Sequence, residues 1–305
     1  MAPTELTPEL SQLFQSIETR FKDTHLGDER WYLLVIACLS ASPDPESAAA
    51  LYQYLTRQEV YQSSGSRQAL VRRLREALIK TTILVGVCKP LEAILSIMKV
   101  EKPEDRDFSQ TRDGWQADQA NHDRGIDWFK KVYTRNAGDT MGLFDAHKDF
   151  AWVSAEITYG LFLSDRQVLD DTDTQLVVLP VIMSQNLPLE THWHIRGTRR
   201  IGVSKEDVQV IWDNWNRHRR HGKMTRLVSG GRAQRWGLAS VQHSCWSNTG
   251  QRCTRNALTN VVQLQAADLA KTRRRDGIEW RPAPLPDAPN RLVSTINANN
   301  SPPNA

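Results

Sequence analysis

The segment LPLETHWHIRG, at residues 187–197, contains the two side chains best suited to chemistry, Glu190 and His194. In a helix, residues four apart differ by about 40° around the axis, so these two side chains lie on one face. A carboxylate beside an imidazole can fix its tautomer and hold its pKa near neutrality, which suits general acid–base catalysis. The spacing leaves one alternative open, a solvent-exposed pair with no catalytic role.

Metal and dithiol chemistry lack the residues they need. Glu190 and His194 supply two metal ligands, and the sequence offers no third ligand at a suitable spacing. His192 lies about 200° from His194 around the helix, so it faces elsewhere. The four cysteines form no C-x-x-C pair, so the parts of a zinc ribbon or a dithiol redox centre are missing. We therefore expect neither a metal nor a cofactor.

The elements that position Glu190 and His194 are predicted to be helices. Residues 5–22 and 66–82 have apolar side chains at helical spacing, and in 66–82 the arginines and lysine are expected to face outward. Residues 31–41 are continuously apolar, and their length favours a buried helix over a buried strand. Gly202 ends the helix that carries His194, and Ser204 caps the next helix. Further helices are predicted at residues 121–135, 144–164 and 172–185. The fold class is therefore all-α.

An internal duplication is predicted from the order of the apolar segments. Pro45 and Pro188 each follow an apolar segment and begin a helix, and an offset of 143 residues aligns them. The same offset sets residues 33–36 over residues 176–179. We divide the chain into a first helical repeat at 1–100, a polar and helical connection at 101–143, a second repeat at 144–212, and a basic tail at 213–305.

The predicted tail differs from the rest of the chain in charge and in pattern. Its net charge is +10, whereas residues 1–212 carry a net charge of −6. It has no sustained helical or alternating period, which predicts a mostly irregular segment. Because it also lacks a zinc-finger, basic-zipper or RNP motif, the sequence does not favour nucleic-acid binding. An alternative is that a misplaced reading frame or intron boundary near residue 212 produced this segment.

Composition and the first residues predict a cytoplasmic protein. The 305 residues are 40% hydrophobic and 24% charged, which is typical of a globular chain. No apolar run approaches the roughly 20 residues of a transmembrane helix. The opening MAPTELTPELSQLFQ lacks the basic and then apolar profile of a secretory signal. We therefore expect no membrane association.

Residues 194–208, HIRGTRRIGVSKEDV, resemble the signature H-x-R-G-A-x-x-x-G-x-[ST]-x-E-E-[IV] of the carboxymuconolactone decarboxylase-like family, which belongs to the AhpD-like superfamily. Tyr159, Gly160 and the following LSDRQVLDDTDTQLVVL resemble the stretch that precedes this signature. The sequences REAL at 75–78 and GVCKPLEA at 86–93 resemble two further elements of the same family. The match is good over 159–208, looser over 31–98 and absent after 212, and the pattern is most similar to that of fungal members.

The resemblance implies an AhpD-like helical fold, a homo-oligomer, and a site between helices. Peroxidase members use a C-x-x-C pair, but Leu187 and Glu190 occupy its positions here, which disfavours peroxidase activity. Decarboxylase members use a histidine and a carboxylate, which agrees with His194 and Glu190. Gln175 stands nineteen residues before His194, where the family commonly has a glutamate.

The resemblance implies a cofactor-free carboxy-lyase or isomerase that acts on a small carboxylated lactone or a related metabolite. His194 would be the acid, and Glu190 would orient it. Gln175 would donate an amide hydrogen bond to the substrate, Arg196 would hold a substrate carboxylate, and Tyr159 would line the pocket. The alternative is a catalytically silent helical oligomer that acts as a scaffold or a small-molecule binder.

Overall fold

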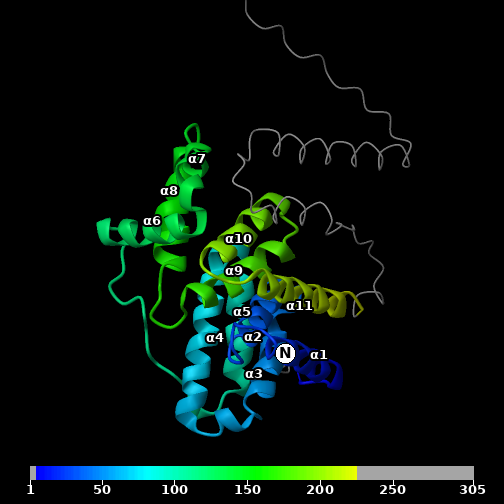
Figure 1. Ribbon diagram of the computed structural model, residues 1–305. Helices are drawn as coiled ribbons and strands as arrows, with labels where there is room; N and C mark the ends of the chain where they lie inside the picture. Colours follow the sequence, from blue (N-terminus) through cyan, green and yellow to red (C-terminus); the bar gives the residue numbers. More distant parts are fainter. Residues whose placement is uncertain (1–4, 225–305) are drawn as a thin grey trace, which may run out of the picture. The chain divides into compact units, whose positions relative to one another are not determined.

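The computed structural model describes residues 5–224, and this part of the chain is helical and contains no strand, which confirms the all-α prediction (Figure 1). Short 3₁₀ turns and one π-helix, η5 (Val153–Leu163), connect or extend the α-helices. The α-helices are α1 (Pro8–Phe21), α2 (Trp31–Ala41), α3 (Ala48–Leu55), α4 (Ser64–Val85), α5 (Cys88–Val100), α6 (Gln119–Tyr133), α7 (Ala137–Gly142), α8 (Lys148–Trp152), α9 (Asp171–Ser184), α10 (Pro188–Arg200) and α11 (Lys205–Met224).

Local capping fixes where several helices begin. The hydroxyl of Thr7 accepts a hydrogen bond from the backbone N–H of Leu10, and Pro8 takes the first helical position of α1. Asp170 and Asp173 form a reciprocal capping box at the start of α9. The hydroxyl of Ser204 accepts from the backbone N–H of Asp207, as the sequence predicted.

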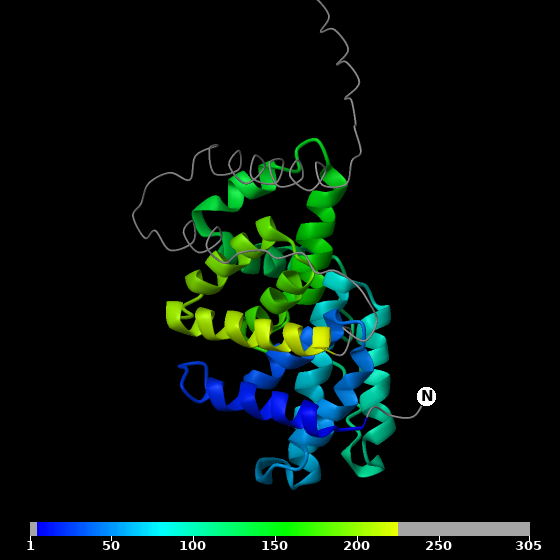
Figure 2. The ribbon, with the colours of Figure 1, turned by 90° about the vertical axis from the view of Figure 1, so that its right-hand side faces the viewer.

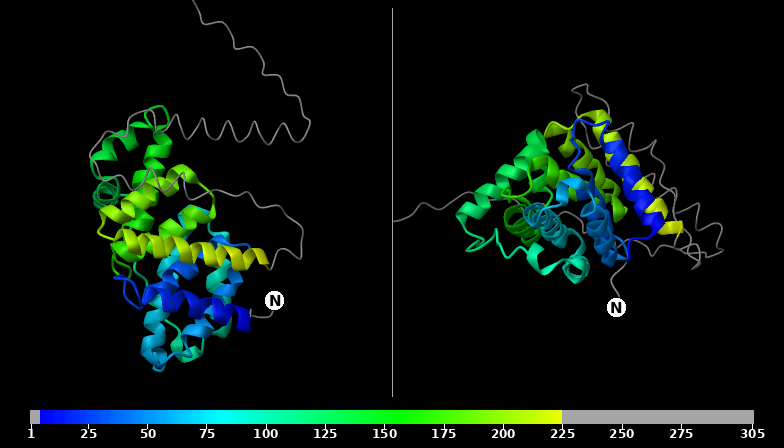
Figure 3. Two further views of the ribbon diagram at one scale, coloured as in Figure 1. Left: turned by 45° about the vertical axis from the view of Figure 1, so that its right-hand side comes forward. Right: turned by 90° about the horizontal axis from the view of Figure 1, so that it is seen from below.

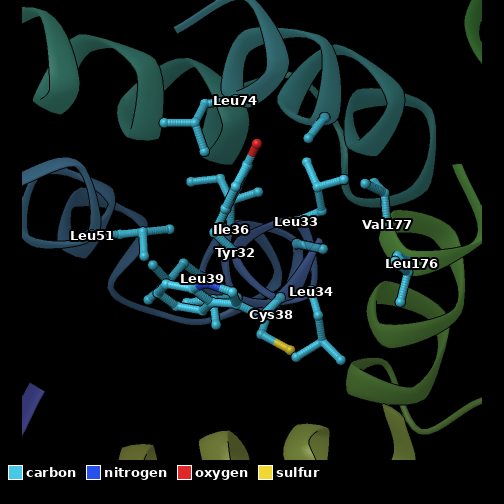
Figure 4. Close-up of a cluster of buried hydrophobic side chains, with 14 of the residues drawn as sticks. Tyr32, Leu33, Leu34, Ile36, Cys38, Leu39, Leu51, Leu74, Leu176 and Val177 are labelled. Atoms are coloured by element: carbon cyan, nitrogen blue, oxygen red, sulfur yellow. The ribbon is translucent and has the colours of Figure 1, made fainter. Parts of the chain in front are cut away.

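Helix α2 lies at the centre of the larger hydrophobic cluster (Figure 4). Every residue from Trp31 to Ser40 is buried, which confirms a buried helix at this position. It packs against α3, α4, α5, α9 and α11, and Leu74 of α4 and Val177 of α9 both point toward it in Figure 4. An apolar helix surrounded on all sides has no polar face, which is why its sequence shows no amphipathic period.

A second hydrophobic cluster joins α6, η5 and α9, in the green region of Figures 1 and 2. Gly125 of α6 lies so close to η5 that an added Cβ would stand 2.6 Å from the carbonyl oxygen of Ala155. Gly160 of η5 makes the reciprocal approach, with the Asn121 side chain 2.4 Å from a hypothetical Cβ. The two glycines therefore allow α6 and η5 to pack backbone against backbone. The predicted helix at 144–164 consists of α8 followed by this π-helix.

Helices from the two predicted repeats pack against one another. Helix α2 packs on α9, α4 contacts α2 and α9, and α11 likewise contacts both. Helices α1 and α11 lie side by side in Figure 3, and they are in contact. Descent of the two halves from one duplicated segment stays a prediction, as do the domain boundaries inferred from it.

Helix α4 differs from the prediction on its charged face. Leu70, Leu74 and Leu78 are buried as expected, but Lys80 and Glu76 are buried too. The Lys80 ammonium donates to the carbonyl oxygens of Leu163 at 3.0 Å and Asp165 at 2.8 Å. These acceptors lie more than 80 residues away, so no local pattern could have revealed them.

The predicted start of the tail, at residue 213, falls inside α11. Asn214 and Trp215 are buried, and the Trp215 indole N–H donates to Ser184 at 3.0 Å. Val208, Ile211 and Trp215 continue one apolar stripe, whereas Arg219 and Arg220 lie on the exposed face. Residues 225–305, the remainder of the predicted tail, lie outside the described residues. Within 5–224, no helix is long and apolar enough to cross a membrane.

Candidate functional site

His194 is a buried, neutral histidine near the middle of α10. Its exposed fraction is 6%, and its Nδ1 atom has no hydrogen-bond partner among residues 5–224. Burial lowers the pKa of His194 from the ordinary value of 6.5 to about 4, because a charged imidazolium would lose its hydration. Its imidazole is therefore uncharged at neutral pH, and its buried Nδ1 atom leaves one hydrogen-bonding position unused within residues 5–224. Pro188 at the first helical position starts the helix that carries it.

Gln175 reaches α10 from the neighbouring helix α9. Its amide oxygen accepts a hydrogen bond from the Thr198 hydroxyl at 3.2 Å, and the same hydroxyl lies 2.7 Å from the carbonyl oxygen of His194. The amide nitrogen of Gln175 is buried and has no partner within the described part of the chain. Two unpartnered buried polar atoms, Nδ1 of His194 and Nε2 of Gln175, therefore lie on the contacting helices α10 and α9. The Thr198 hydroxyl contacts the Gln175 side chain and the backbone carbonyl of His194, not the imidazole. They are two of thirteen buried side-chain atoms in the described residues that have no partner, and an ordered water or a ligand would satisfy such an atom.

Tyr159 of η5 approaches His194 through a second tyrosine, Tyr133 of α6. The Tyr159 hydroxyl donates to the Tyr133 hydroxyl at 3.2 Å, which leaves the Tyr133 proton available to a ligand. The rings of Tyr133 and His194 meet edge to face, with their centroids 6.3 Å apart. We call His194, Gln175, Thr198, Tyr133 and Tyr159 the candidate site.

Close packing and one arginine hold the helices around the candidate site. A Cβ added to Gly197 would stand 2.5 Å from a methyl group of Val132, so α10 and α6 approach each other closely at this point. Arg200 donates to the carbonyl oxygens of Val132 at 2.9 Å and Tyr133 at 2.7 Å, at the C-terminal end of α6. These contacts fix Tyr133 relative to α10, because both anchor points lie on its own turn of helix.

Of the five predicted site residues, His194, Gln175 and Tyr159 belong to the candidate site, whereas Glu190 and Arg196 do not. Glu190 is partly buried, and its charge helps to raise the pKa of Tyr133, although burial of that phenol is the larger cause. Glu190 does not accept a hydrogen bond from Nδ1 of His194. The charge of Arg196 acts on His192 and Arg200, where it lowers both pKa values in addition to the effect of burial. No contact places Arg196 beside His194 within residues 5–224.

Sequence reasoning missed Tyr133 and Thr198. Thr198 is four residues after His194, so the helical spacing that paired His194 with Glu190 also points to it. Tyr133 lies 61 residues before His194 in a different helix, and its sequence context resembles that of an ordinary core aromatic residue. Only the packing of α6 on α10 identifies it.

The candidate site contains a proton acceptor, two hydrogen-bond donors and an apolar border, all of which acid–base chemistry uses. A neutral imidazole can accept a proton, and an amide N–H and a phenol O–H can donate hydrogen bonds to a developing negative charge. The aromatic rings of Tyr133, Tyr159 and Phe129 pack against one another and exclude water from its border. The low polarity of this border strengthens every charge interaction inside it.

Comparison with known proteins gives two distant relatives. A fission-yeast protein from Schizosaccharomyces pombe, named Peroxisomal protein 2, is 23% identical over 198 residues, which cover 64% of this chain and 86% of the relative. A Saccharomyces cerevisiae protein of the same name is 20% identical over 242 residues, which cover 59% of this chain and 84% of the relative. No protein-family model matches the chain. No solved structure matches it either.

These relatives correct the predicted location. The sequence predicted a cytoplasmic protein, and both similar proteins are named as peroxisomal. The error has a physical reason. The prediction rested on apolar segments alone, whereas peroxisomal import depends on short receptor-read signals that add no apolar segment.

Proposed function

We propose that this protein is a peroxisomal, cofactor-free lyase or isomerase that acts on a small carboxylated metabolite, with His194 as its acid–base residue. The observation that carries this proposal is the pair of buried, unpartnered atoms Nδ1 of His194 and Nε2 of Gln175. The names of the two yeast relatives support the peroxisomal location. The resemblance of residues 159–208 to carboxymuconolactone decarboxylase-like proteins supports the reaction class.

Binding of a carboxylated substrate prepares His194 for proton transfer. A carboxylate beside the buried imidazole favours the charged form, so it raises the His194 pKa from about 4 and lets the imidazole take up a proton. The resulting ion pair lies in surroundings of low polarity, where the attraction between the charges is strong. The site is therefore an acid only when its substrate is present.

Loss of CO₂ then needs a place for the electron pair. In a carboxylated lactone, the bond to the leaving carboxylate breaks, and its electrons pass through the conjugated double bond to the carbonyl oxygen. The Gln175 amide N–H and the Tyr133 hydroxyl donate hydrogen bonds to that oxygen. The His194 imidazolium delivers its proton to carbon and returns to the neutral form. In an isomerisation, the same imidazole removes a proton from one carbon and returns it to another.

A second candidate function is binding without turnover, as a small-molecule binder or a helical scaffold. Gln175 favours it, because an amide cannot exchange protons as the family's glutamate can. In this case the substitution Gln175→Glu would create activity that the natural protein lacks. The homo-oligomer implied by the resemblance belongs to both candidates.

Turnover by purified full-length protein tests the proposed activity. The probes are carboxylated butenolides and β,γ-unsaturated acids, incubated in D₂O and followed by CO₂ release and by deuterium incorporation at carbon. We expect the wild type to be active and His194→Gln to lose activity by at least roughly 100-fold. His192→Gln is the matched control, because His192 is two residues away on the same helix and its pKa is also lowered to about 4, mainly by burial.

Two results test the proposed activity against the alternative, and a third tests the location. Full activity of His194→Gln with unchanged helical circular dichroism would remove His194 from the mechanism. Saturable binding of a probe without CO₂ release or deuterium incorporation would establish the binder. Cell fractionation tests the location, and we expect the full-length chain to sediment with peroxisomal catalase.

A further inference from the structure

A cavity of about 450 Å³ lies between α4 and the segment that follows η3 (Pro103–Asp105), away from the candidate site. Arg72 and Arg75 reach it from α4, and Arg112 reaches it from the segment before α6. The volume is within the range of small-molecule sites. We call this space the arginine cavity.

Some guanidinium N–H groups in the arginine cavity make no hydrogen bond to the carboxylates that line it. Arg72 pairs with Asp107 through Nη1 alone, so Nε and Nη2 of its guanidinium have no acceptor in the described part of the chain. Arg75 uses its two Nη atoms on Asp107 and Ser109 and keeps Nε free. Burial alone would raise the pKa of Asp107, but hydrogen bonds from Ser109 and Arg75 hold it below its usual range. Asp107 is therefore ionised and aligns the two guanidiniums.

The charge below the arginine cavity is fully paired. Glu76 is 2% exposed and accepts two hydrogen bonds from Arg112, at 2.6 and 2.7 Å. Lys80 lies 3.5 Å from Glu76, and Asp165 lies 3.3 Å from Arg112. Two cations and two anions balance in this network. At the mouth, Arg72 and Arg75 both hydrogen-bond to the one carboxylate of Asp107, and the charge of Glu101 also acts on Arg75 without a hydrogen bond to it.

The arginine cavity also has an apolar wall. Ile79 and Val168 contribute aliphatic surface, and Phe108 stands at the edge with an exposed fraction of 90%. A phenylalanine with that exposure gains nothing from the folded chain around it. It offers a flat apolar face to a ligand whose charged group lies against the arginines.

We propose that the arginine cavity binds a small organic oxyanion, with its phosphate or carboxylate on Arg72 and Arg75 and its apolar body on Phe108. Two neighbouring guanidiniums with free N–H groups match the planar or tetrahedral oxygens of such an anion. The cavity is independent of the candidate site, because the two share no residue.

Isothermal titration of full-length protein tests the proposal with three probes: phenyl phosphate, benzoate and inorganic phosphate. Phenyl phosphate and benzoate distinguish the two oxyanion groups, and inorganic phosphate lacks the apolar body. We expect saturable binding of phenyl phosphate or benzoate, and weaker binding of inorganic phosphate. Arg72→Gln should weaken the organic probe roughly tenfold, and Phe108→Ser should weaken it roughly threefold without affecting inorganic phosphate.

The control variants remove one positive charge and one exposed apolar side chain elsewhere on the surface. Arg57→Gln and Val60→Ser change exposed residues on the turn after α3, and both variants should bind like the wild type. Absence of saturable binding of all three probes at 10 mM, roughly the weakest affinity expected of a built site, would overturn the proposal. Binding that falls in His194→Gln and persists in Arg72→Gln would also overturn it, because the probe would then occupy the candidate site.

Discussion

Replacement of His194 by leucine should abolish part of the pH dependence of stability. The pKa of this imidazole is lowered from 6.5 to about 4 by burial, so between these values the unfolded chain binds a proton that the folded chain does not. The free energy of unfolding of the wild type therefore falls as the pH falls through this window. For this pKa difference, proton linkage predicts that His194 lowers the free energy of unfolding by about 2 kcal/mol between pH 7 and pH 5. His194→Leu should lack that loss.

Urea unfolding at pH 7 and pH 5, followed by circular dichroism, measures the difference. The wild type should lose about 2 kcal/mol more than His194→Leu between the two pH values. His147→Leu is the control and should keep the wild-type difference, because water solvates this exposed imidazole in both states. Equal pH dependence in the wild type and His194→Leu would refute the argument that His194 is buried as a neutral group.

Three further substitutions test the packing around the two sites. Glu76→Gln should lower the free energy of urea unfolding by about 3 kcal/mol, because Arg112 loses its buried carboxylate, and a loss below about 1 kcal/mol would contradict the buried network. Gly160→Ala should cost about 2 kcal/mol in the same assay, since the new methyl group meets the buried Asn121 side chain, and an unchanged midpoint would argue against this close approach. Tyr159→Phe should cost about 1 kcal/mol through loss of its hydrogen bond, and a variant as stable as the wild type would show that this hydroxyl is not buried and bonded.

Much of the helical fold follows from apolar spacing. The buried stripe of α1, from Leu13 to Phe21, and that of α4 were predicted because a period of 3.6 residues marks a face that packs on a core. Helix α2 has no such period, and its length decided the prediction. The π-helix η5 was not predicted, because its apolar spacing does not distinguish a π-helix from an α-helix.

The main error in the predicted fold concerned charged side chains of α4 that are buried instead of exposed. Glu76 and Lys80 have the sequence context of an exposed helix face, yet their partners Arg112, Leu163 and Asp165 come from distant segments. The predicted start of the tail falls inside α11 for a related reason. The boundary was set by the excess of arginines after residue 212. The apolar stripe of α11 nevertheless continues through Trp215.

The candidate site could be predicted in part. Spacing and the resemblance identified His194 and Gln175, because both lie in the one segment with a specific motif. The tertiary fold decided the rest. Tyr133 enters from α6, whereas the charge of Arg196 acts on His192 and Arg200. Glu190 was expected to orient His194, but Nδ1 of His194 has no hydrogen-bond partner within residues 5–224.

The most direct test of the account is nuclear magnetic resonance of protein labelled with ¹⁵N in its histidine side chains, with His194 assigned by comparison with His194→Gln. In the free protein, the His194 imidazole should be neutral at pH 7 and protonate near pH 4. A saturating carboxylated butenolide should raise that midpoint by at least roughly one pH unit, because the bound carboxylate stabilises the imidazolium. A midpoint that stays the same when the ligand is bound would contradict the proposed role of His194.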